Sequence, residues 1–254
     1  MLRDVAVISL ATLAAGAINA IAGGGTLLSF PALLWIGRSA IAANATNSVA
    51  LWPGSLAGAL GFRNEVQTLS RWLLWLMIPS LAGGAIGALL LLHTPEKLFT
   101  QIVPWLILGA TVLLAGQELI AKRLRSLTSA NEHPSRGWIV FAFTFQLFVA
   151  IYGGYFGAGQ GILMLASLGL IGLTDLHQMN GLKNLLATCI NGVAAILFAI
   201  SGKVLWRDAA IMTVAAIAGG YLGARVARRL GRKFVRFAVV TIGFVMTIAL
   251  FLKM

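Results

Sequence analysis

The sequence has little charge. Only 10% of its 254 residues are Asp, Glu, Lys or Arg, and 59% are hydrophobic. An average soluble domain is about 25% charged and about 45–50% apolar. No charged residue occurs in 5–37, 39–62 or 137–174, and a membrane-spanning helix needs about 20 mainly apolar residues. The composition therefore predicts an all-α polytopic membrane protein and excludes a soluble enzyme, a coiled coil and a disordered chain.

The residues that most enzymes and metal sites need are also scarce. Cys189 is the only cysteine, which excludes an intrachain disulfide. His93, His133 and His177 are too far apart to have metal-ligand spacing. The chain has no His-Glu-x-x-His motif, no Gly-x-Ser-x-Gly motif, no ATP-binding motif and no paired carboxylates within an apolar run. We therefore expect no enzyme activity, no catalytic residue, no metal and no cofactor.

The charge that is present is mainly positive, with 19 Lys and Arg against 7 Asp and Glu. In a soluble protein this excess would suggest a nucleic-acid partner, but in a membrane protein basic loops set orientation. We expect the lipid bilayer as a partner and no nucleic acid. If ten apolar segments all cross, twelve basic residues fall on one side and six on the other. This imbalance predicts a multi-pass membrane protein with both termini outside.

The two halves of the chain match at a constant offset of 136 residues. The matching positions are Gly23 and Gly25 with Gly159 and Gly161, Asn44 with Asn180, Gly83, Gly84 and Gly87 with Gly219, Gly220 and Gly223, and Lys97 with Lys233. One offset shared by separate segments indicates a duplicated unit. We predict a first membrane repeat at 1–121, a cytoplasmic linker at 122–136 and a second membrane repeat at 137–254. Five segments per unit would invert the second copy, an arrangement typical of secondary transporters.

Two glycine clusters interrupt the apolar runs. They are Gly23, Gly24 and Gly25 in the first half and 157–161 in the second, which includes Gly159, Gln160 and Gly161. Glycine frees the backbone to turn and exposes the first N–H groups of the next helix, where anions bind well. The clusters predict glycine-broken short helices at 26–36 and 162–173, which would rise only about 16–18 Å. Tight turns or close helix packing are the alternative, and whether these segments fully cross the bilayer stays open.

A polar stripe recurs in both halves. Its members stand at spacings i, i+3, i+4 and i+11 and are Asn44, Asn47, Ser48 and Ser55, then Asn180, Lys183, Asn184 and Asn191. This spacing places each set on one helix face. Polar side chains inside a membrane usually face a cavity or one another, so the stripes predict a substrate path, with interhelical hydrogen bonding as the alternative. Lys183 replaces Asn47 in the second stripe, either as a cation for an anionic ligand or as a side chain that reaches the interface.

Four stretches carry a family resemblance. Ala-Gly-Gly-Gly-Thr-Leu-Leu-Ser-Phe-Pro-Ala-Leu at 22–33 and Ala-Asn-Ala-Thr-Asn-Ser at 43–48 resemble the first repeat of the sulfite exporter TauE/SafE family. Gly-Ala-Gly-Gln-Gly-Ile-Leu-Met-Leu-Ala at 157–166 and Met-Asn-Gly-Leu-Lys-Asn-Leu-Leu-Ala at 179–187 resemble its second repeat. The resemblance implies a bacterial inner-membrane permease for small anions such as sulfite or organosulfonates. Gln160 and Ser167, which stands opposite Pro31, depart from symmetry between the two repeats.

Together these features predict a secondary transporter, and specifically an exporter, of small anions. The glycine turns would offer N–H donors, Lys183 a positive charge, and the Asn and Ser side chains neutral hydrogen bonds. Without an ATP-binding motif, an ion gradient or the substrate gradient must supply the energy. A passive channel for anions or small solutes is the alternative. The sequence leaves open the substrate, the direction, the coupling ion and whether the chain forms a homodimer.

Overall fold

The chain is entirely helical wherever the computed structural model describes it, namely in residues 2–21, 24–61, 70–128, 136–170, 173, 176–230 and 232–252. These ranges contain ten helices and no strand. The helices are α1 (Leu2–Ile21), α2 (Thr26–Trp35), α3 (Ala40–Gly61), α5 (Ser70–His93), α6 (Glu96–Thr128), α7 (Arg136–Tyr155), α8 (Gln160–Leu170), α9 (Leu176–Ile200), α10 (Trp206–Leu230) and α11 (Arg232–Phe251). The predicted all-α fold is confirmed.

Several helices have the character of membrane spans. Four described segments are long and apolar enough to cross a bilayer, namely Leu2–Asn19, Trp75–His93, Glu96–Leu119 and Gln178–Ile200. Large apolar side chains also point outward, with Phe148 63% and Ile200 78% exposed. An extensive apolar exterior suits lipid rather than water, so the chain is a multi-pass membrane protein.

The two short segments are shorter than a bilayer. α2 has 10 residues and α8 has 11, so each rises only about 15–17 Å, roughly half of a hydrocarbon core of about 30 Å. Neither helix is long enough to span the core by itself, as expected from the short apolar segments in the sequence. Helix α6 also continues to Thr128, so residues 122–128 of the predicted linker are helical, while 129–135 lie outside the described residues.

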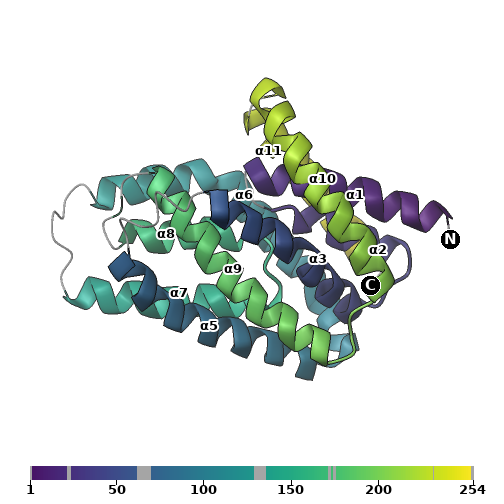
Figure 1. Cartoon of the computed structure of the whole chain (residues 1–254), viewed down its shortest axis with the longest axis horizontal. Coiled ribbons are helices and arrows are strands. Elements are labelled where there is room, and N and C mark those ends of the chain that lie inside the picture. The colour runs from purple at the N-terminus through teal and green to yellow at the C-terminus, as the bar shows by residue number, and fades with distance from the viewer. Residues whose placement is uncertain are drawn as a thin grey trace.

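The helices of the two halves correspond in position. Helices α9, α10 and α11 begin 136 residues after α3, α5 and α6. Their packing partners correspond as well. α1 packs along α10 just as α7 packs along α5, and α10 contacts α3 just as α5 contacts α9 (Figure 1). The duplication read from the sequence is therefore matched by an approximate two-fold exchange of packing partners.

Glycine allows the paired helices to approach closely. A Cβ placed on Gly83 of α5 would lie 2.7 Å from the carbonyl oxygen of Leu147 in α7. At the equivalent position of the second half, a Cβ on Gly219 of α10 would collide with the carbonyl of Leu13 in α1. Both helix pairs therefore depend on a missing side chain at the same place in the duplicated unit.

Helices α3 and α9 pack against each other in antiparallel directions. The Trp52 Nε1–H in α3 donates to the carbonyl oxygen of Thr188 in α9 at 3.1 Å, and these residues are 136 apart in the sequence. Earlier in α3, the Thr46 hydroxyl oxygen accepts from the N–H of Leu205, which follows α9, at 3.0 Å. A position in α3 thus bonds to its own counterpart in α9 at the 136 offset.

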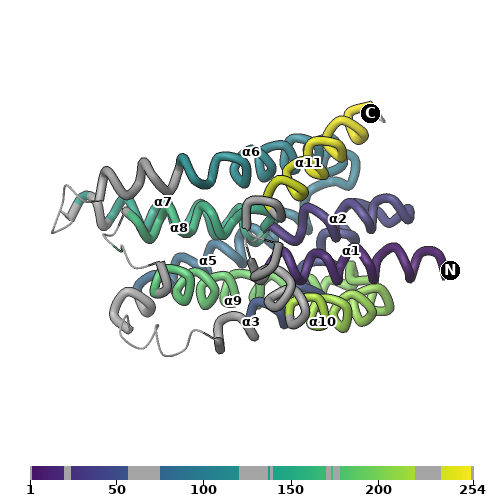
Figure 2. Tube along the Cα trace, turned by 90° about the horizontal axis from the view of Figure 1, so that it is seen from above, coloured from purple at the N-terminus to yellow at the C-terminus, as the bar shows by residue number. Residues whose placement is uncertain are grey.

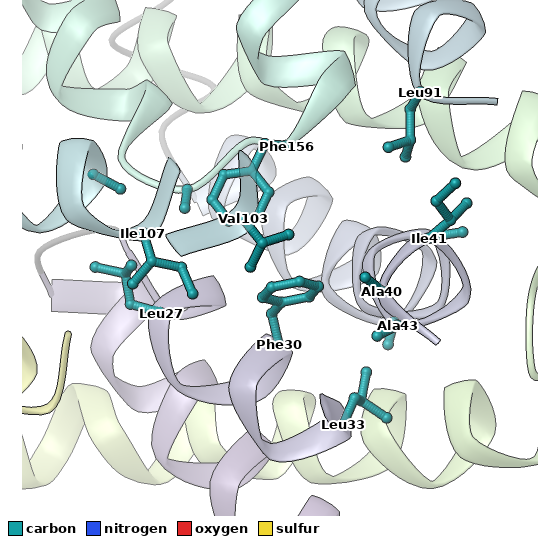
Figure 3. Packing of buried hydrophobic residues seen from close by; sticks show 14 of the residues in the cluster. Leu27, Phe30, Leu33, Ala40, Ile41, Ala43, Leu91, Val103, Ile107 and Phe156 are labelled. Atoms are coloured by element: carbon teal, nitrogen blue, oxygen red, sulfur yellow. The ribbon is translucent and has the colours of Figure 1, made fainter. Parts of the chain in front are cut away.

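The larger hydrophobic core surrounds α2. Phe30 of α2 packs edge-to-face on Phe156, which follows α7, with ring centroids 5.4 Å apart. Leu27, Val103 and Ile107 close around this pair (Figure 3). A second cluster, which includes Leu76, Val149, Met164, Leu182 and Leu186, joins α5, α7, α8 and α9. These cores hold the start of each short helix against α6 and against the opposite half of the chain.

An ion pair between Arg38 and Asp208 joins the two halves, and its removal should lower stability. The Arg38 Nε lies 2.7 Å from Asp208 Oδ2, with the side chains 36% and 8% exposed. We expect Asp208→Asn to lower the free energy of unfolding because it removes this ion pair. The loss should be only about 1 kcal/mol, because solvent around the partly exposed Arg38 weakens the attraction. This corresponds to a melting temperature lower by about 2–4 °C in detergent. Glu118→Gln is the control, because Glu118 pairs with Arg236 at 2.7 Å but is 56% exposed. An equal shift in both variants would contradict this prediction.

Candidate functional site

The two glycine turns meet on one face of α6. Gly24 and Gly159 have φ values of 101° and 75°, in the left-handed region that glycine adopts without strain. A Cβ on Gly24 would lie 3.7 Å from Leu114 Cδ2, and a Cβ on Gly159 would lie 3.6 Å from Ala110 Cα. Ala110 and Leu114 are one turn apart on α6. Two turns distant in sequence are therefore neighbours in space.

The first turn is built largely from internal contacts. The N–H of Gly25 donates to Asn19 Oδ1 at 3.4 Å, and the Gly25 carbonyl accepts from the N–H of Leu28 at 2.9 Å. A Cβ on Gly25 would collide with the main-chain carbonyl of Ala15. This turn thus leaves fewer free N–H donors than the sequence suggested. Gly23 lies outside the described residues.

Asn47 binds the start of α2. Its Oδ1 accepts a hydrogen bond from the Ser29 hydroxyl, and its Nδ2 donates to Thr26 Oγ1 at 3.4 Å. Asn47 is 1% exposed and Ser29 is fully buried. Both ends of this carboxamide therefore hold α3 against α2. Sequence reasoning did not select Ser29 or Thr26, whose only signal was a hydroxyl within an apolar segment.

Asn44 and Ser48 differ in what they connect. The Asn44 Nδ2 donates to the carbonyl oxygen of Tyr155 at 2.9 Å, which ties α3 to the end of α7 in the other half. Asn44 Oδ1 is buried and has no partner among the described residues. The Ser48 hydroxyl donates to the Asn44 carbonyl of its own helix at 2.9 Å. Asn44 thus bridges the halves, whereas Ser48 bonds locally.

Lys183 lies beside the second glycine turn. Its Nζ donates to Asn180 Oδ1 at 3.1 Å, and its Cδ lies 3.4 Å from the point where a Cβ on Gly161 would stand. The side chain is partly buried. Asn184 contributes its main-chain carbonyl, which accepts from the Thr188 hydroxyl at 2.8 Å. Lys183 therefore lies at the start of α8 in the same way that Asn47 lies at the start of α2.

Gln160 completes the second turn. Its Nε2 donates to Asn191 Oδ1 at 3.0 Å, and the residue is only 7% exposed. Six of the predicted residues thus come together where α8 begins against α9, namely Gly159, Gln160, Gly161, Asn180, Lys183 and Asn191. Within the described ranges no group of His, Cys, Asp or Glu is arranged to hold a metal ion.

Comparison with known proteins identifies the family of this chain. The sequence model of the sulfite exporter TauE/SafE family matches residues 8–250. The chain belongs to the sulfite exporter TauE/SafE family. Its family resemblance is thereby confirmed. This TauE/SafE member is placed among membrane transporters rather than enzymes.

Relatives of this TauE/SafE chain come from several bacteria. "Probable membrane transporter protein" of Haemophilus influenzae is 29% identical and aligns with 91% of this chain and 88% of its own length. "Probable membrane transporter protein YfcA" of Escherichia coli is 32% identical, with 92% and 84% covered. "Probable membrane transporter protein ORF9" of Sinorhizobium sp. is 27% identical, with 93% and 88% covered. No solved structure matches the chain.

Proposed function

We propose that this protein is a secondary transporter that exports small anions, such as sulfite or an organosulfonate, across the inner membrane. The observation that carries the proposal is the meeting of the two glycine turns on α6, with Lys183 beside one of them. The family and the names of the relatives favour a transporter over a passive channel.

The anion binds where α8 begins. A helix N-terminus carries partial positive charge, and the Lys183 ammonium adds a full one at the same place. Asn180, already within hydrogen-bond distance of Lys183 Nζ at 3.1 Å, orients this ammonium. Because Lys183 is partly buried, the attraction between ammonium and anion is stronger there than in bulk solvent. The first half has only neutral Asn47 at the equivalent position, so it shapes the path without supplying charge.

The two halves form inverted repeats that move against each other. The antiparallel α3 and α9, with Trp52 bonded to its counterpart Thr188, support an axis in the membrane plane. α1 and α2 lie at the end of the molecule with both termini, whereas α7 and α8 lie at the opposite end (Figure 2). Rocking of such repeats gives alternating access to a site at their interface.

The predicted orientation depends on how each short helix lies in the bilayer together with the helix that precedes it. If α1 and α2 together enter and return, the connections on either side of the pair keep the same sides as with two crossings. The same holds for α7 and α8. The turns themselves, 22–25 and 156–159, contain no Lys or Arg. The imbalance of twelve to six basic residues therefore stands in both cases. If α1 and α7 cross while α2 and α8 re-enter without crossing, the counts become ten and eight and the bias largely vanishes.

Cysteine labelling tests this orientation. In a Cys189→Ala background, an impermeant thiol reagent added to intact cells should label Ser201→Cys, which replaces an exposed residue after α9. It should not label Ser129→Cys in the linker, a position outside the described residues, until the membrane is permeabilised. Basic loops remain cytoplasmic, which is the physical reason for the difference. Labelling of the linker alone in intact cells would reverse the proposed orientation.

A ligand screen tests the substrate class. The purified protein is heated with sulfite, thiosulfate, sulfate, sulfoacetate or simple carboxylates, and its melting temperature is recorded. A ligand that binds the folded state raises apparent stability by mass action, so sulfite or sulfoacetate should raise the melting temperature in a saturable way. Stabilisation by carboxylates alone would change the substrate class, and no stabilisation by any anion would contradict the proposal.

A further inference from the structure

Gly153 of α7 makes room for the Gln160 side chain. A Cβ placed on Gly153 would collide with Gln160 Oε1, and it would lie 3.0 Å from the Ile190 Cγ2 of α9. Gln160 therefore fills the space that any larger residue at 153 would occupy. From there its Nε2 reaches Asn191 Oδ1 at 3.0 Å. A side chain at 153 would therefore displace the Gln160 carboxamide, the end of a flexible side chain, from the position in which it bonds to Asn191.

By the sequence offset of 136 this arrangement has no counterpart in the first half, although α7 and α8 themselves begin 134 residues after α1 and α2. At the 136 offset, Gly153 corresponds to Ala17 and Gln160 corresponds to Gly24. The first half therefore has a methyl group at 17, in the place that the Gln160 carboxamide takes beside Gly153 in the second half. Asn191, the partner of Gln160, corresponds to Ser55. The two positions differ together: the second half has no side chain at 153 and a long one at 160, whereas the first half has a methyl group at 17 and no side chain at 24. This paired difference indicates that Gly153 and Gln160 act as a unit.

The unit is maintained at an energetic cost. Gln160 Oε1 is buried and has no hydrogen-bond partner among the described residues, and an unsatisfied buried acceptor is unfavourable. Glycine within a helix is also less favourable than alanine. The half that carries this unfavourable pair is the half that carries Lys183. A local violation of folding preferences next to a cation is typical of a functional site.

We infer that Gly153 is a positioning residue for the anion site: it lets Gln160 bind Asn191 and thereby fixes the start of α8 relative to Lys183. This inference rests on the proposed function. Lys183 and Asn191 lie on the same helix, α9, and Gly161, over which Lys183 lies, directly follows Gln160. The Gln160–Asn191 bond therefore fixes the start of α8, where the N–H groups of Gln160 and Ile162 bond to the carbonyls of Gly157 and Gly159, relative to the ammonium. A positive helix terminus and an ammonium that are fixed in advance bind an anion better than mobile groups do.

A double-substitution cycle on the full-length purified protein tests the inference with sulfite as the probe. Gly153→Ala should weaken sulfite binding about tenfold, and Gln160→Gly should do the same, because each breaks the bond to Asn191. The double variant, which reproduces the Ala17 and Gly24 pair of the first half, should also bind about tenfold more weakly, not a hundredfold. It should melt higher than Gly153→Ala alone, since the added methyl no longer meets a carboxamide.

The readouts separate positioning from simple packing. Gly154→Ala is the matched control, because its Cβ would collide with the main-chain carbonyl of Gly84, and its effect on melting should not depend on residue 160. If Gly153→Ala lowers the melting temperature but leaves the sulfite affinity of the folded protein unchanged, or if the two effects on affinity multiply, the inference is wrong. If the wild type binds none of the anions in the screen, the proposed function itself fails and Gly153 positions no anion site.

Discussion

Replacing Lys183 by methionine is expected to weaken anion binding by about ten- to a hundredfold. Methionine keeps most of the length and the apolar stem, which lies over Gly161, but removes the ammonium. A hydrogen bond to a charged group contributes roughly 1.5–3 kcal/mol, and about 1.4 kcal/mol corresponds to tenfold in affinity. Calorimetric titration of the purified variant with sulfite or sulfoacetate measures the change.

Two further variants act as controls for this result. Asn47→Ala should reduce affinity less, because Asn47 is neutral and its carboxamide binds Ser29 and Thr26. Lys183→Arg should restore binding only in part, because a planar guanidinium does not replace a compact ammonium. If methionine at 183 is tolerated and arginine behaves as the wild type, Lys183 is a side chain that reaches the interface and has no part in the site.

Valine is expected to have different effects at the two glycine turns, a loss of folded protein at position 25 and a loss of anion affinity at position 161. Gly25→Val should remove most of the folded protein from the membrane, because the Cβ of residue 25 would collide with the main-chain carbonyl of Ala15. Overpacking against fixed atoms costs about 1–3 kcal/mol or more. At Gly161 the Cβ would lie 3.4 Å from Lys183 Cδ, which belongs to a flexible side chain. Gly161→Val should therefore fold but displace Lys183 and lose anion affinity.

Size-exclusion profiles of detergent extracts, together with sulfite titration of the monodisperse fraction, distinguish these outcomes. Normal yield of Gly25→Val would mean that α1 and α2 pack less closely than the contact with Ala15 indicates. Wild-type affinity in Gly161→Val would separate the second glycine turn from the anion site.

Much of the fold follows from patterns in the sequence. The low charge and the long apolar runs predict a helical membrane protein because lipid excludes unpaired backbone groups. The 136 offset predicts which helices correspond, since corresponding helices begin at matching residues such as Ser70 and Trp206. Helical spacing also places Asn180, Lys183 and Asn184 on one face. These features depend on local periodicity and on duplication, both of which are visible in one sequence.

The partners of the polar residues were not predictable in the same way. Spacing indicates that Asn47 faces inward, but only three-dimensional packing shows that Ser29 and Thr26 meet it. The meeting of the two glycine turns at Ala110 and Leu114 of α6 depends on contacts between distant segments that consist of ordinary apolar residues. The difference between Ala17 and Gly24 in the first half and Gly153 and Gln160 in the second can be read from the sequence. Its meaning depends on the contact between Gly153 and Gln160, which only the structure shows.

Counterflow in proteoliposomes tests most directly whether this protein is a secondary transporter of small anions. Vesicles that contain the purified protein are loaded with unlabelled sulfite at high concentration and diluted into trace labelled sulfite at zero membrane potential. A carrier that alternates access exchanges internal for external anion, so the label should accumulate transiently above its equilibrium level, and Lys183→Met should abolish this overshoot. Simple equilibration of the label without an overshoot in the wild type would indicate a passive channel, and no movement of the label would exclude sulfite as substrate.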